Sequence, residues 1–498
     1  MQPLLLGLDI GSSSVKAALV SVETGKTVAF AQSPTEEMEI SAPVAGWAEQ
    51  SPDHWWEHTC SCIKQCLQQV GRHGEKIKAI GIAYQMHGLV AVDKEGIPVR
   101  PAIIWCDSRA VTLGEQAFAA LGESYCLSHL LNSPGNFTAS KLKWVMENEP
   151  EVYARIHKVM LPGDYIAYKL TGEITTTDTG LSEGVFWDYT QGDIAVSLLD
   201  YYGIDRSLLA KVKPVFSIQG TLTAQAAQET GLSAGTAVSY RAGDQPNNAF
   251  SLKVLNPGET AATAGTSGVI YNVTDRNVYD PKSRVNTFIH VGNEAGRTRN
   301  GVLLCVNGTG ILNNWLRRNF KTGISSLTYS QMNGVAAEVT PGSEGLMVLP
   351  FGNGAERIFE NKVIHSSWHG MDFNRHTQAH LLRAAQEGIV FALKYGFDIL
   401  QSMGLEVSVI RAGNANMFLS PVFREVLVNT MQVPLQLYDT DGAKGAALGA
   451  GLGAGIYASM EETFAGLEKI QEENPLPFKQ EEYEEIYTKW KNILNSYL

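Results

Sequence analysis

The chain has 498 residues, of which 44% are hydrophobic and 18% charged, and its formal net charge is -12. A chain of this length exceeds the size at which one hydrophobic core keeps growing, so we expect two domains. The acidic balance argues against a nucleic-acid-binding protein, because such binding depends on Lys and Arg residues that neutralise phosphates. The composition is that of a globular enzyme rather than a disordered or fibrous chain.

The segments that could direct the chain to a membrane or out of the cell do not fit those roles. The apolar N-terminus lacks a basic region and reaches Asp9 too early for a signal peptide. The small-residue run at 445–457 is too short to cross a bilayer of about 30 Å. We therefore expect a cytoplasmic protein with no membrane partner. The six cysteines do not form a secreted disulfide framework, and we expect buried free thiols at Cys60, Cys62 and Cys66.

Strands open the chain and then alternate with helices. The hydrophobic pattern predicts strands at 4–10, 15–22 and 26–33. Ser51 followed by Pro52 predicts the start of a helix. The apolar run at 77–84 predicts a buried strand, and those at 89–92 and 102–105 predict further strands, with 89–92 as the neighbour of 77–84.

The first candidate site follows the first strand, where residues 6–16 read LGLDIGSSSVK. Such a turn offers backbone N–H groups and serine hydroxyls to a phosphate, with the Asp9 carboxylate beside them for Mg²⁺. A second loop, TAGTSG at 263–268, is also rich in glycine and hydroxyls and precedes an apolar run. Two such loops would let two lobes face one polyphosphate.

Three further segments place reactive side chains just after predicted strands. Gln85 and His87, in the sequence QMHG, offer hydrogen bonds suited to sugar hydroxyls. The sequence WCDSR at 105–109 adds an aromatic wall, an Asp and an Arg. Asp244 follows a glycine at the end of a strand, where it can approach a hydroxyl closely, so it is the candidate general base.

The strand pattern restarts after the Pro/Gly break at 256–258, which predicts an N-terminal domain at 1–256 and a C-terminal domain at 257–498. Long amphipathic helices are predicted at 377–403 and 480–498. Strands interleaved with helices in both halves predict the α/β class.

The motifs DIGSSSVK, QMHG, WCDSR, GDQ and GTSG, taken in this order with a glycine-rich turn near the C-terminus, resemble the FGGY carbohydrate kinases. QMHG followed by WxDxR is most similar to the xylulokinase branch of that family. The resemblance covers nearly the whole chain. It implies two actin-like ATPase (ribonuclease H-like) domains with a cleft between them.

The resemblance also implies roles for individual residues. Asp244 would be the catalytic base, and Asp9 would act with it in catalysis and in holding Mg²⁺. The implied sugar-binding residues are Gln85, Met86, His87, Asp107, Arg109, Asp244 and Gln245. The implied ATP-binding residues are Gly11, Ser12, Ser13, Ser14, Lys16, Gly265, Thr266, Ser267, Gly268, Gly310, Asn314, Gly413, Asn414 and Asn416.

The reaction implied by the resemblance transfers the γ-phosphoryl group of Mg-ATP to the terminal hydroxyl of a ketopentose, with D-xylulose the first choice. Kinases for gluconate, ribulose or glycerol are the alternatives within the family. An actin-fold ATPase that phosphorylates no sugar is the alternative from another class. Homodimers are common in the family.

The sequence departs from the family pattern at three places. AGNAN at 412–416, in the turn on the adenine side, stands where the family usually has a glycine pair or triplet. The run at 352–358 keeps Glu356 and Arg357 and loses the usual Thr-Pro, and Gln245 replaces the more common Asn. Ser182-Glu183-Gly184 has no assigned role.

Overall fold

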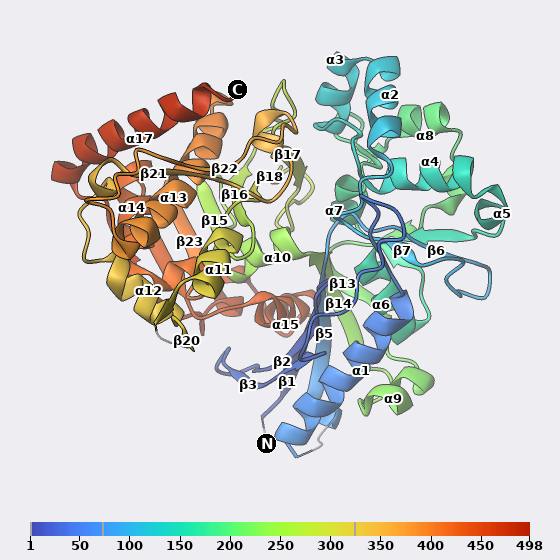
Figure 1. The fold of residues 1–498 in the computed structure, drawn as a ribbon. Coiled ribbons are helices and arrows are strands. Elements are labelled where there is room, and N and C mark those ends of the chain that lie inside the picture. Colours follow the sequence, from blue (N-terminus) through green and yellow to red (C-terminus); the bar gives the residue numbers. More distant parts are fainter. Residues whose placement is uncertain (1, 72–73, 323–324) are drawn as a thin grey trace. The chain divides into compact units, whose positions relative to one another are not determined.

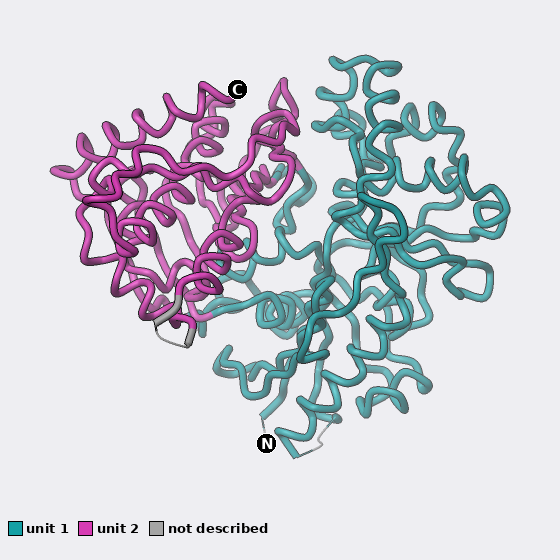
Figure 2. Tube along the Cα trace, viewed as in Figure 1, with its two compact units in different colours: residues 1–253, 288–300, 440–467 teal, residues 254–287, 301–439, 468–498 magenta. Residues whose placement is uncertain are grey.

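The computed structural model describes residues 2–71, 74–322 and 325–498. The chain forms two compact units (Figure 2). Unit 1 comprises Met1–Lys253, Phe288–Asn300 and Thr440–Leu467, and unit 2 comprises Val254–Thr287, Gly301–Asp439 and Glu468–Leu498. The first change of unit lies close to the break predicted at 256–258. Two parts of the chain that we assigned to the C-terminal domain, 288–300 and 440–467, belong to unit 1.

A six-stranded sheet forms the centre of unit 1. In order across the sheet, its strands are β13 (Phe216–Thr221), β14 (Ala237–Gly243), β5 (Ile77–Tyr84), β1 (Leu4–Ile10), β2 (Val15–Ser21) and β3 (Thr27–Ser33). β1 is antiparallel to β2 and parallel to β5, which is parallel to β14. The carboxyl ends of β1, β5 and β14 therefore share one edge of the sheet, which is where Asp9, Gln85 and Asp244 are found.

A glycine-rich helix, α15 (Gly442–Gly453), packs closely on this sheet (Figure 1). A Cβ atom at Gly7 would lie 1.8 Å from the Ala443 carbonyl oxygen, and one at Gly81 would lie 1.9 Å from that of Ala446. Only glycine leaves room for the helix backbone at these two sheet positions. The small residues of α15 therefore serve close packing, which brings the start of the helix to the end of β1.

Unit 2 contains a seven-stranded sheet with the same core arrangement of a hairpin beside two parallel strands. Five strands lie wholly in the unit, in the order β16 (Gly268–Thr274), β15 (Glu259–Ala264), β23 (Val409–Gly413), β24 (Leu435–Tyr438) and β25 (Lys469–Glu473). β18 (Asn300–Val306) and β17 (Asn286–Ile289) complete the sheet beyond β16. β15 is antiparallel to β16 and parallel to β23, as β1 is to β2 and β5. The two loops that we singled out thus occupy equivalent hairpin turns.

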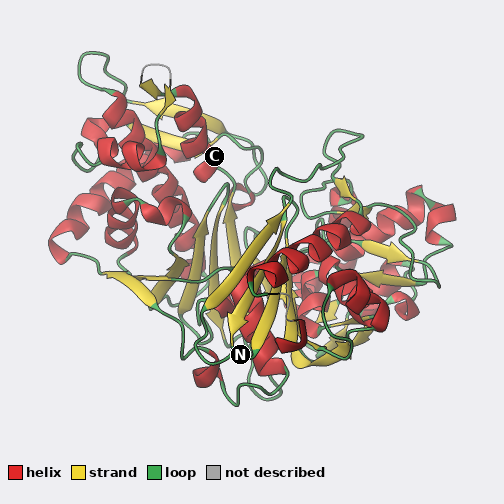
Figure 3. Ribbon diagram, turned by 90° about the horizontal axis from the view of Figure 1, so that it is seen from below, coloured by secondary structure: helices red, strands yellow, loops and turns green. Residues whose placement is uncertain are grey.

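Helices lie against the strands in both units (Figure 3). Those of unit 1, besides α15, are α1 (Pro52–Gln69), α2 (Val111–Leu121), α3 (Glu123–Tyr125), α4 (Thr138–Asn148), α5 (Pro150–Tyr153), α6 (Pro162–Thr171), α7 (Asp178–Glu183), α8 (Val196–Tyr202), α9 (Ala224–Thr230), α10 (Asp244–Ser251) and α16 (Met460–Thr463). Those of unit 2 are α11 (Gly310–Asn319), α12 (Tyr329–Ala336), α13 (Gln378–Ser402), α14 (Pro421–Met431) and α17 (Gln480–Asn495).

Each unit has its own hydrophobic core. In unit 1, α1 covers β2 and β3 with Trp55, Ile63 and its three cysteines, which are buried free thiols as predicted. In unit 2, α13 provides the central helix of the segment predicted at 377–403, and its apolar residues from Leu382 to Phe397 are buried in the core. None of the helices in the described parts of the chain is long and apolar enough to cross a membrane.

Unit 1 also contains short strands outside its central sheet, and their pairing contradicts one prediction. They are β4 (Glu49–Gln50), β6 (Val90–Val92), β7 (Ala102–Ile103), β8 (Lys158–Met160), β9 (Thr175–Thr176), β10 (Trp187–Asp188), β11 (Asp193–Ile194) and β12 (Lys211–Val212). The predicted pairing of 89–92 with 77–84 is wrong, because β6 pairs with β8. In unit 2, short strands occur at β19 (Lys321–Thr322), β20 (Ser325–Ser326), β21 (Met347–Phe351) and β22 (His365–His369).

Candidate active site

The first predicted phosphate loop joins β1 to β2. Asp9 on β1 is opposite Lys16 on β2 in the register of the hairpin. The Gly11 N–H donates to the Ser14 carbonyl oxygen at 3.1 Å, which closes the turn. Ser13 is exposed, and the Ser12 hydroxyl accepts a hydrogen bond from Trp105 Nε1 at 3.2 Å. The turn therefore holds a carboxylate, an ammonium group and hydroxyls within one hairpin.

Asp244, the predicted base, is the first residue of α10 and directly follows β14. The pKa of its carboxyl is raised to about 7, first by burial and then by the nearby Asp9 carboxylate, while hydrogen bonds with Gln245 act in the opposite direction. Strand order thus brings Asp9 and Asp244 together although they are far apart in the sequence. A carboxyl with a pKa near 7 can accept a proton efficiently at neutral pH.

A third carboxylate, Asp441, lies in the same place and was not predicted. It caps α15 by accepting the Lys444 N–H at 2.9 Å, and it raises the pKa of Asp9, after the larger effect of burial. A Cβ atom at Gly442 would lie 2.7 Å from Asp9 Oδ2, so glycine is needed there. The pair Asp-Gly before a run of small residues is a helix-start signal that could have revealed this site. The N-terminus of a helix also favours a bound phosphate.

The QMHG segment leaves the carboxyl end of β5 beside these carboxylates. The Gln85 N–H donates to the Ile10 carbonyl oxygen at 2.9 Å, which ties this segment to β1. Gln50 links the same two segments, because its Nε2 donates to the Ser12 carbonyl oxygen at 2.7 Å and its Oε1 lies 3.5 Å from Gln85 Nε2. No sequence signal identified Gln50, whose role depends on long-range contacts.

Met86 lies against Gly243, and His87 contacts Glu183 and two phenylalanines. A Cβ atom at Gly243 would lie 2.7 Å from Met86 Cγ, so glycine makes room for the methionine beside the base. His87 has a left-handed backbone with φ of 62°. Its Nδ1 lies 2.8 Å from the Glu183 carbonyl oxygen, and its ring packs edge-on against Phe137 and near Phe288.

Glu183, to which the sequence motifs assign no role, is buried beside the candidate base. Its Oε2 lies 2.6 Å from the position that a Cβ atom would take at Gly243. Burial raises the pKa of Glu183 well above its ordinary value, and Asp244 adds to this effect. The Tyr84 hydroxyl approaches the carboxyl and opposes the rise, but neither group completes a hydrogen bond of normal geometry. Both carboxyl oxygens of Glu183 thus lack a hydrogen-bond partner.

Asp107 and Arg109, predicted to bind substrate, contact each other and neighbouring residues of the protein. The Asp107 carboxylate accepts hydrogen bonds from the Arg109 side chain and from the Ala48 N–H, at 2.6 Å for the latter. Arg109 also pairs with Glu49 at 2.7 Å and stacks on Trp47, with 3.8 Å between guanidinium carbon and ring centre. Both side chains are fully buried, so their polar groups are occupied within the protein.

The second predicted phosphate loop, in unit 2, joins β15 to β16. Thr266 is exposed at its tip, and Gly265 and Ser267 are partly exposed. The start of α11 rests on this loop, because the N–H groups of Gly310 and Ile311 donate to the carbonyl oxygens of Gly265 and Thr266 at 2.9 and 3.1 Å. A Cβ atom at Gly310 would lie 2.2 Å from the Gly265 oxygen, which explains the glycine.

The predicted adenine-side turn follows β23 in the same unit. Asn416 has a left-handed backbone with φ of 55°, and its Nδ2 lies 3.7 Å from the Cβ position of Gly265. Asn414 is exposed, and its N–H donates to the Tyr438 carbonyl oxygen at 3.0 Å. Asn314, one turn into α11, is partly exposed. Unit 2 therefore brings its predicted nucleotide residues to one edge of its sheet.

Glu356 binds the turn that precedes α11, the helix that contacts the second predicted phosphate loop. Its carboxylate accepts the N–H groups of Asn307 and Gly308, each at 2.9 Å, in the turn that leads into α11. Burial raises the pKa of Glu356 to about 7. Glu356, which the sequence retains from the family pattern, thus holds the turn before α11 in place.

The carboxylates of unit 1 fit a magnesium ion that is also held by phosphates. Across residues 2–71, 74–322 and 325–498, no group of three or more His, Cys, Asp and Glu side chains is arranged to hold a metal ion. Magnesium in nucleotide sites uses one or two carboxylates together with phosphate and water oxygens. Asp9 and Asp244, whose mutual repulsion a cation would relieve, provide that number.

The chain matches the model of the FGGY family of carbohydrate kinases, N-terminal domain, over residues 4–251, and that of the C-terminal domain over 260–458. The xylulose kinase of Escherichia coli (strain K12) is 29% identical over 447 residues, covering 89% of this chain and 88% of that protein. The xylulose kinase of Streptomyces rubiginosus is 30% identical over 404 residues, covering 80% and 76%. The crystal structure of xylulose kinase from Rhodospirillum rubrum aligns with a TM-score of 0.86 at 26% identity, covering 99% and 98%. These similarities confirm the predicted family and the two-domain α/β fold.

Proposed function

Because the chain belongs to the FGGY family of carbohydrate kinases and is an ATP-dependent sugar kinase, we propose that it phosphorylates the terminal hydroxyl of D-xylulose. The products would be D-xylulose 5-phosphate and ADP. The names of its relatives support this substrate. The observation that carries the proposal is the position of Asp244, a carboxyl with a pKa of about 7 beside Asp9 and the QMHG segment.

Asp244 would accept the proton of the sugar hydroxyl as its oxygen attacks the γ-phosphorus. Its place at the start of α10, directly after β14, puts the carboxyl at the edge of the sheet where Asp9 and the QMHG segment also lie. The pKa near 7 keeps a useful fraction ionised at neutral pH while making the carboxylate basic enough to take the proton.

Asp9 and Asp244 would hold Mg²⁺, which neutralises charge on the phosphates when bound. Lys16 and the serine hydroxyls of residues 12–14 would bind phosphate oxygens from unit 1. In unit 2, the groups that would bind ATP are Gly265, Thr266, Ser267, Gly268, Gly310, Asn314, Gly413, Asn414 and Asn416. Backbone N–H groups at glycine turns suit phosphates because no side chain blocks their approach.

His87 would orient the sugar, with Met86, Gln85 and Gln245 beside it. We expect His87→Ala to raise the KM for the sugar about tenfold, because one hydrogen bond is lost, and to leave the KM for ATP unchanged. Steady-state kinetics with each substrate varied in turn would measure both constants. An unchanged KM for the sugar would remove His87 from the site.

ADP release from Mg-ATP, measured with a panel of sugars, tests the proposed function. The panel contains D-xylulose, L-xylulose, D- and L-ribulose, gluconate, glycerol and a blank. We expect strong stimulation by D-xylulose. Stimulation by another compound would keep the kinase chemistry and overturn the pentose, and a flat panel with a sugar-independent rate would favour an ATPase that phosphorylates no sugar.

A further inference from the structure

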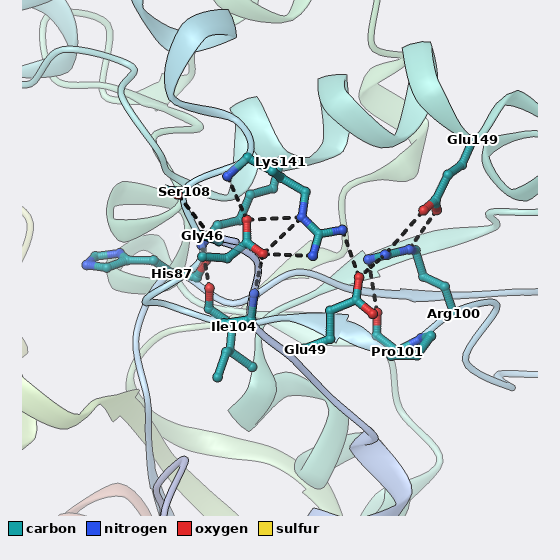
Figure 4. Close-up of polar contacts among 12 residues, drawn as sticks. Gly46, Glu49, His87, Arg100, Pro101, Ile104, Ser108, Lys141 and Glu149 are labelled. Carbon is teal, nitrogen blue, oxygen red and sulfur yellow. Dashed lines mark hydrogen bonds and ion pairs between the residues drawn. The ribbon is translucent and has the colours of Figure 1, made fainter. Parts of the chain in front are cut away.

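Lys141 is a completely buried lysine between the two segments that follow β5 and β7. Its Nζ donates to the His87 carbonyl oxygen at 2.9 Å and to the Ile104 carbonyl oxygen at 3.0 Å (Figure 4). The first oxygen belongs to QMHG and the second immediately precedes WCDSR. Lys141 itself comes from α4, so one side chain connects three segments of unit 1.

The surrounding charges explain how a lysine can stay buried there. Asp107, Glu49 and Glu149 form a chain of ion pairs with Arg109 and Arg100, with all four contacts at 2.6 to 2.7 Å. Three carboxylates and two guanidinium groups leave this chain with one excess negative charge. Burial lowers the pKa of Lys141 to about 7, and Asp107 opposes that effect. A charged Lys141 would balance the cluster.

His87 needs support because its backbone is left-handed, which is unfavourable for a residue other than glycine. Its imidazole is held on one side by the Glu183 carbonyl oxygen. Its own carbonyl oxygen is held on the other side by Lys141. The two contacts together fix both the peptide plane and the ring.

We propose that Lys141 is a positioning residue for the sugar, which it orients by anchoring the carbonyl oxygens of His87 and Ile104. The inference rests on the proposed function in taking His87 as a sugar contact. It predicts that the loss of the Nζ donors weakens sugar binding and leaves nucleotide binding intact.

The test compares Lys141→Met, which keeps the apolar stem, with two controls on the same helix. Lys143→Met removes a lysine that pairs with Glu147 at the surface. Val145→Ala removes buried volume from α4 without removing a polar contact. The KM values for sugar and ATP, kcat and the melting temperature are measured for each, with the panel sugar that the wild type phosphorylates fastest.

We expect Lys141→Met to raise the KM for the sugar at least tenfold and to change the KM for ATP less than twofold. Both controls should leave the KM for the sugar within twofold, even where Val145→Ala lowers the melting temperature as much as Lys141→Met does. An equal rise of sugar KM in Val145→Ala, or an unchanged sugar KM in Lys141→Met, would overturn the proposal.

Hydrogen exchange gives a second measurement that needs no substrate. The Leu89 N–H, just after QMHG, donates to the Ile103 carbonyl oxygen. Its exchange should accelerate at least tenfold in Lys141→Met and stay unchanged in both controls; equal acceleration in Val145→Ala would contradict the inference. If Lys141→Met does not fold, Lys141→Gln, whose shorter amide cannot span both carbonyls, is judged by the same criteria. If the wild type phosphorylates no sugar, the proposed function and the role of Lys141 in orienting the sugar both fail, whereas the hydrogen-exchange result alone overturns only the anchoring of the two carbonyl oxygens.

Discussion

Two buried clusters of charged residues in unit 1 differ in how their charges are satisfied. Around Asp107, each carboxylate has a guanidinium partner, and the side chains of Asp107 and Arg109 are fully buried. Around Asp244, the carboxyls of Asp9 and Glu183 lie close without a guanidinium group paired to them, and the Glu183 carboxyl completes no hydrogen bond of normal geometry. The pKa values of all three are raised.

The difference separates a cluster that stabilises the fold from one that is prepared for a ligand. A paired network is most stable as it stands, so removing one member costs free energy of unfolding. Carboxyls that repel each other are more stable once a cation or a substrate hydroxyl joins them. Active sites commonly keep such unfavourable arrangements, because the ligand completes them.

The largest expected effect on stability comes from breaking the paired cluster. Asp107→Ala leaves Arg109 buried with one partner fewer, so we expect the free energy of unfolding to fall by about 3–5 kcal/mol. Urea unfolding of the purified protein would measure the change. Arg206→Ala, which breaks an exposed pair with Asp193, is the matched control and should hardly alter the unfolding midpoint. Similar small changes in both variants would remove the distinction between the clusters.

The pH dependence of the reaction should report the raised pKa of Asp244. Because the pKa of Asp244 is raised to about 7, its protonated form accumulates as the pH falls, and we expect kcat/KM to drop about tenfold per pH unit below pH 7. The profile is measured at nonsaturating Mg-ATP, so that it reports the free enzyme. Glu356→Gln serves as the control, because the pKa of Glu356 is also about 7. The kcat/KM of this variant should still fall as the pH drops below 7. A flat profile from pH 5.5 to 8 would exclude Asp244 as the base.

The smallest expected effect is a gain of stability from removing the unpaired carboxyl. Glu183→Gln should raise the free energy of unfolding by about 1 kcal/mol at pH 8. The pKa of Glu183 is higher in the folded than in the unfolded chain, so the wild type loses stability as the pH rises above the unfolded value. The gain in the variant should therefore shrink toward pH 5. Unfolding midpoints of both proteins at pH 5 and pH 8 decide this, and a variant less stable at pH 8 would show that Glu183 is paired after all.

Local sequence patterns predicted the elements that carry the site better than they predicted the contacts among them. The limits of β1, β5 and α13 follow from hydrophobic periodicity and capping residues, which are properties of neighbouring positions. The turn after β1 and the glycine before Asp244 were recognisable for the same reason. These local features allowed the family resemblance and the candidate base to be predicted from the sequence.

What the sequence did not predict depends on partners that are distant along the chain. Gln50 and Glu183 became visible only when strand order placed them beside QMHG and Gly243. Asp107 and Arg109 have the residue types of a sugar site, but they pair with each other in the interior. Arg109 also pairs with Glu49 and packs on two tryptophans. Whether a charged side chain faces a ligand or another side chain is set by tertiary packing, which short motifs do not encode.

Phosphoryl transfer by the wild type and by Asp244→Asn, with ATP, Mg²⁺ and D-xylulose, tests the central claim most directly. Product formation is followed by ³¹P NMR, and ATP binding and the melting temperature serve as controls for folding. We predict D-xylulose 5-phosphate from the wild type and a rate at least about 10²-fold lower in the variant, with ATP binding retained. Near-normal formation of the sugar phosphate by Asp244→Asn would contradict the assignment of the base, and the absence of a sugar phosphate from the wild type would contradict the proposed substrate.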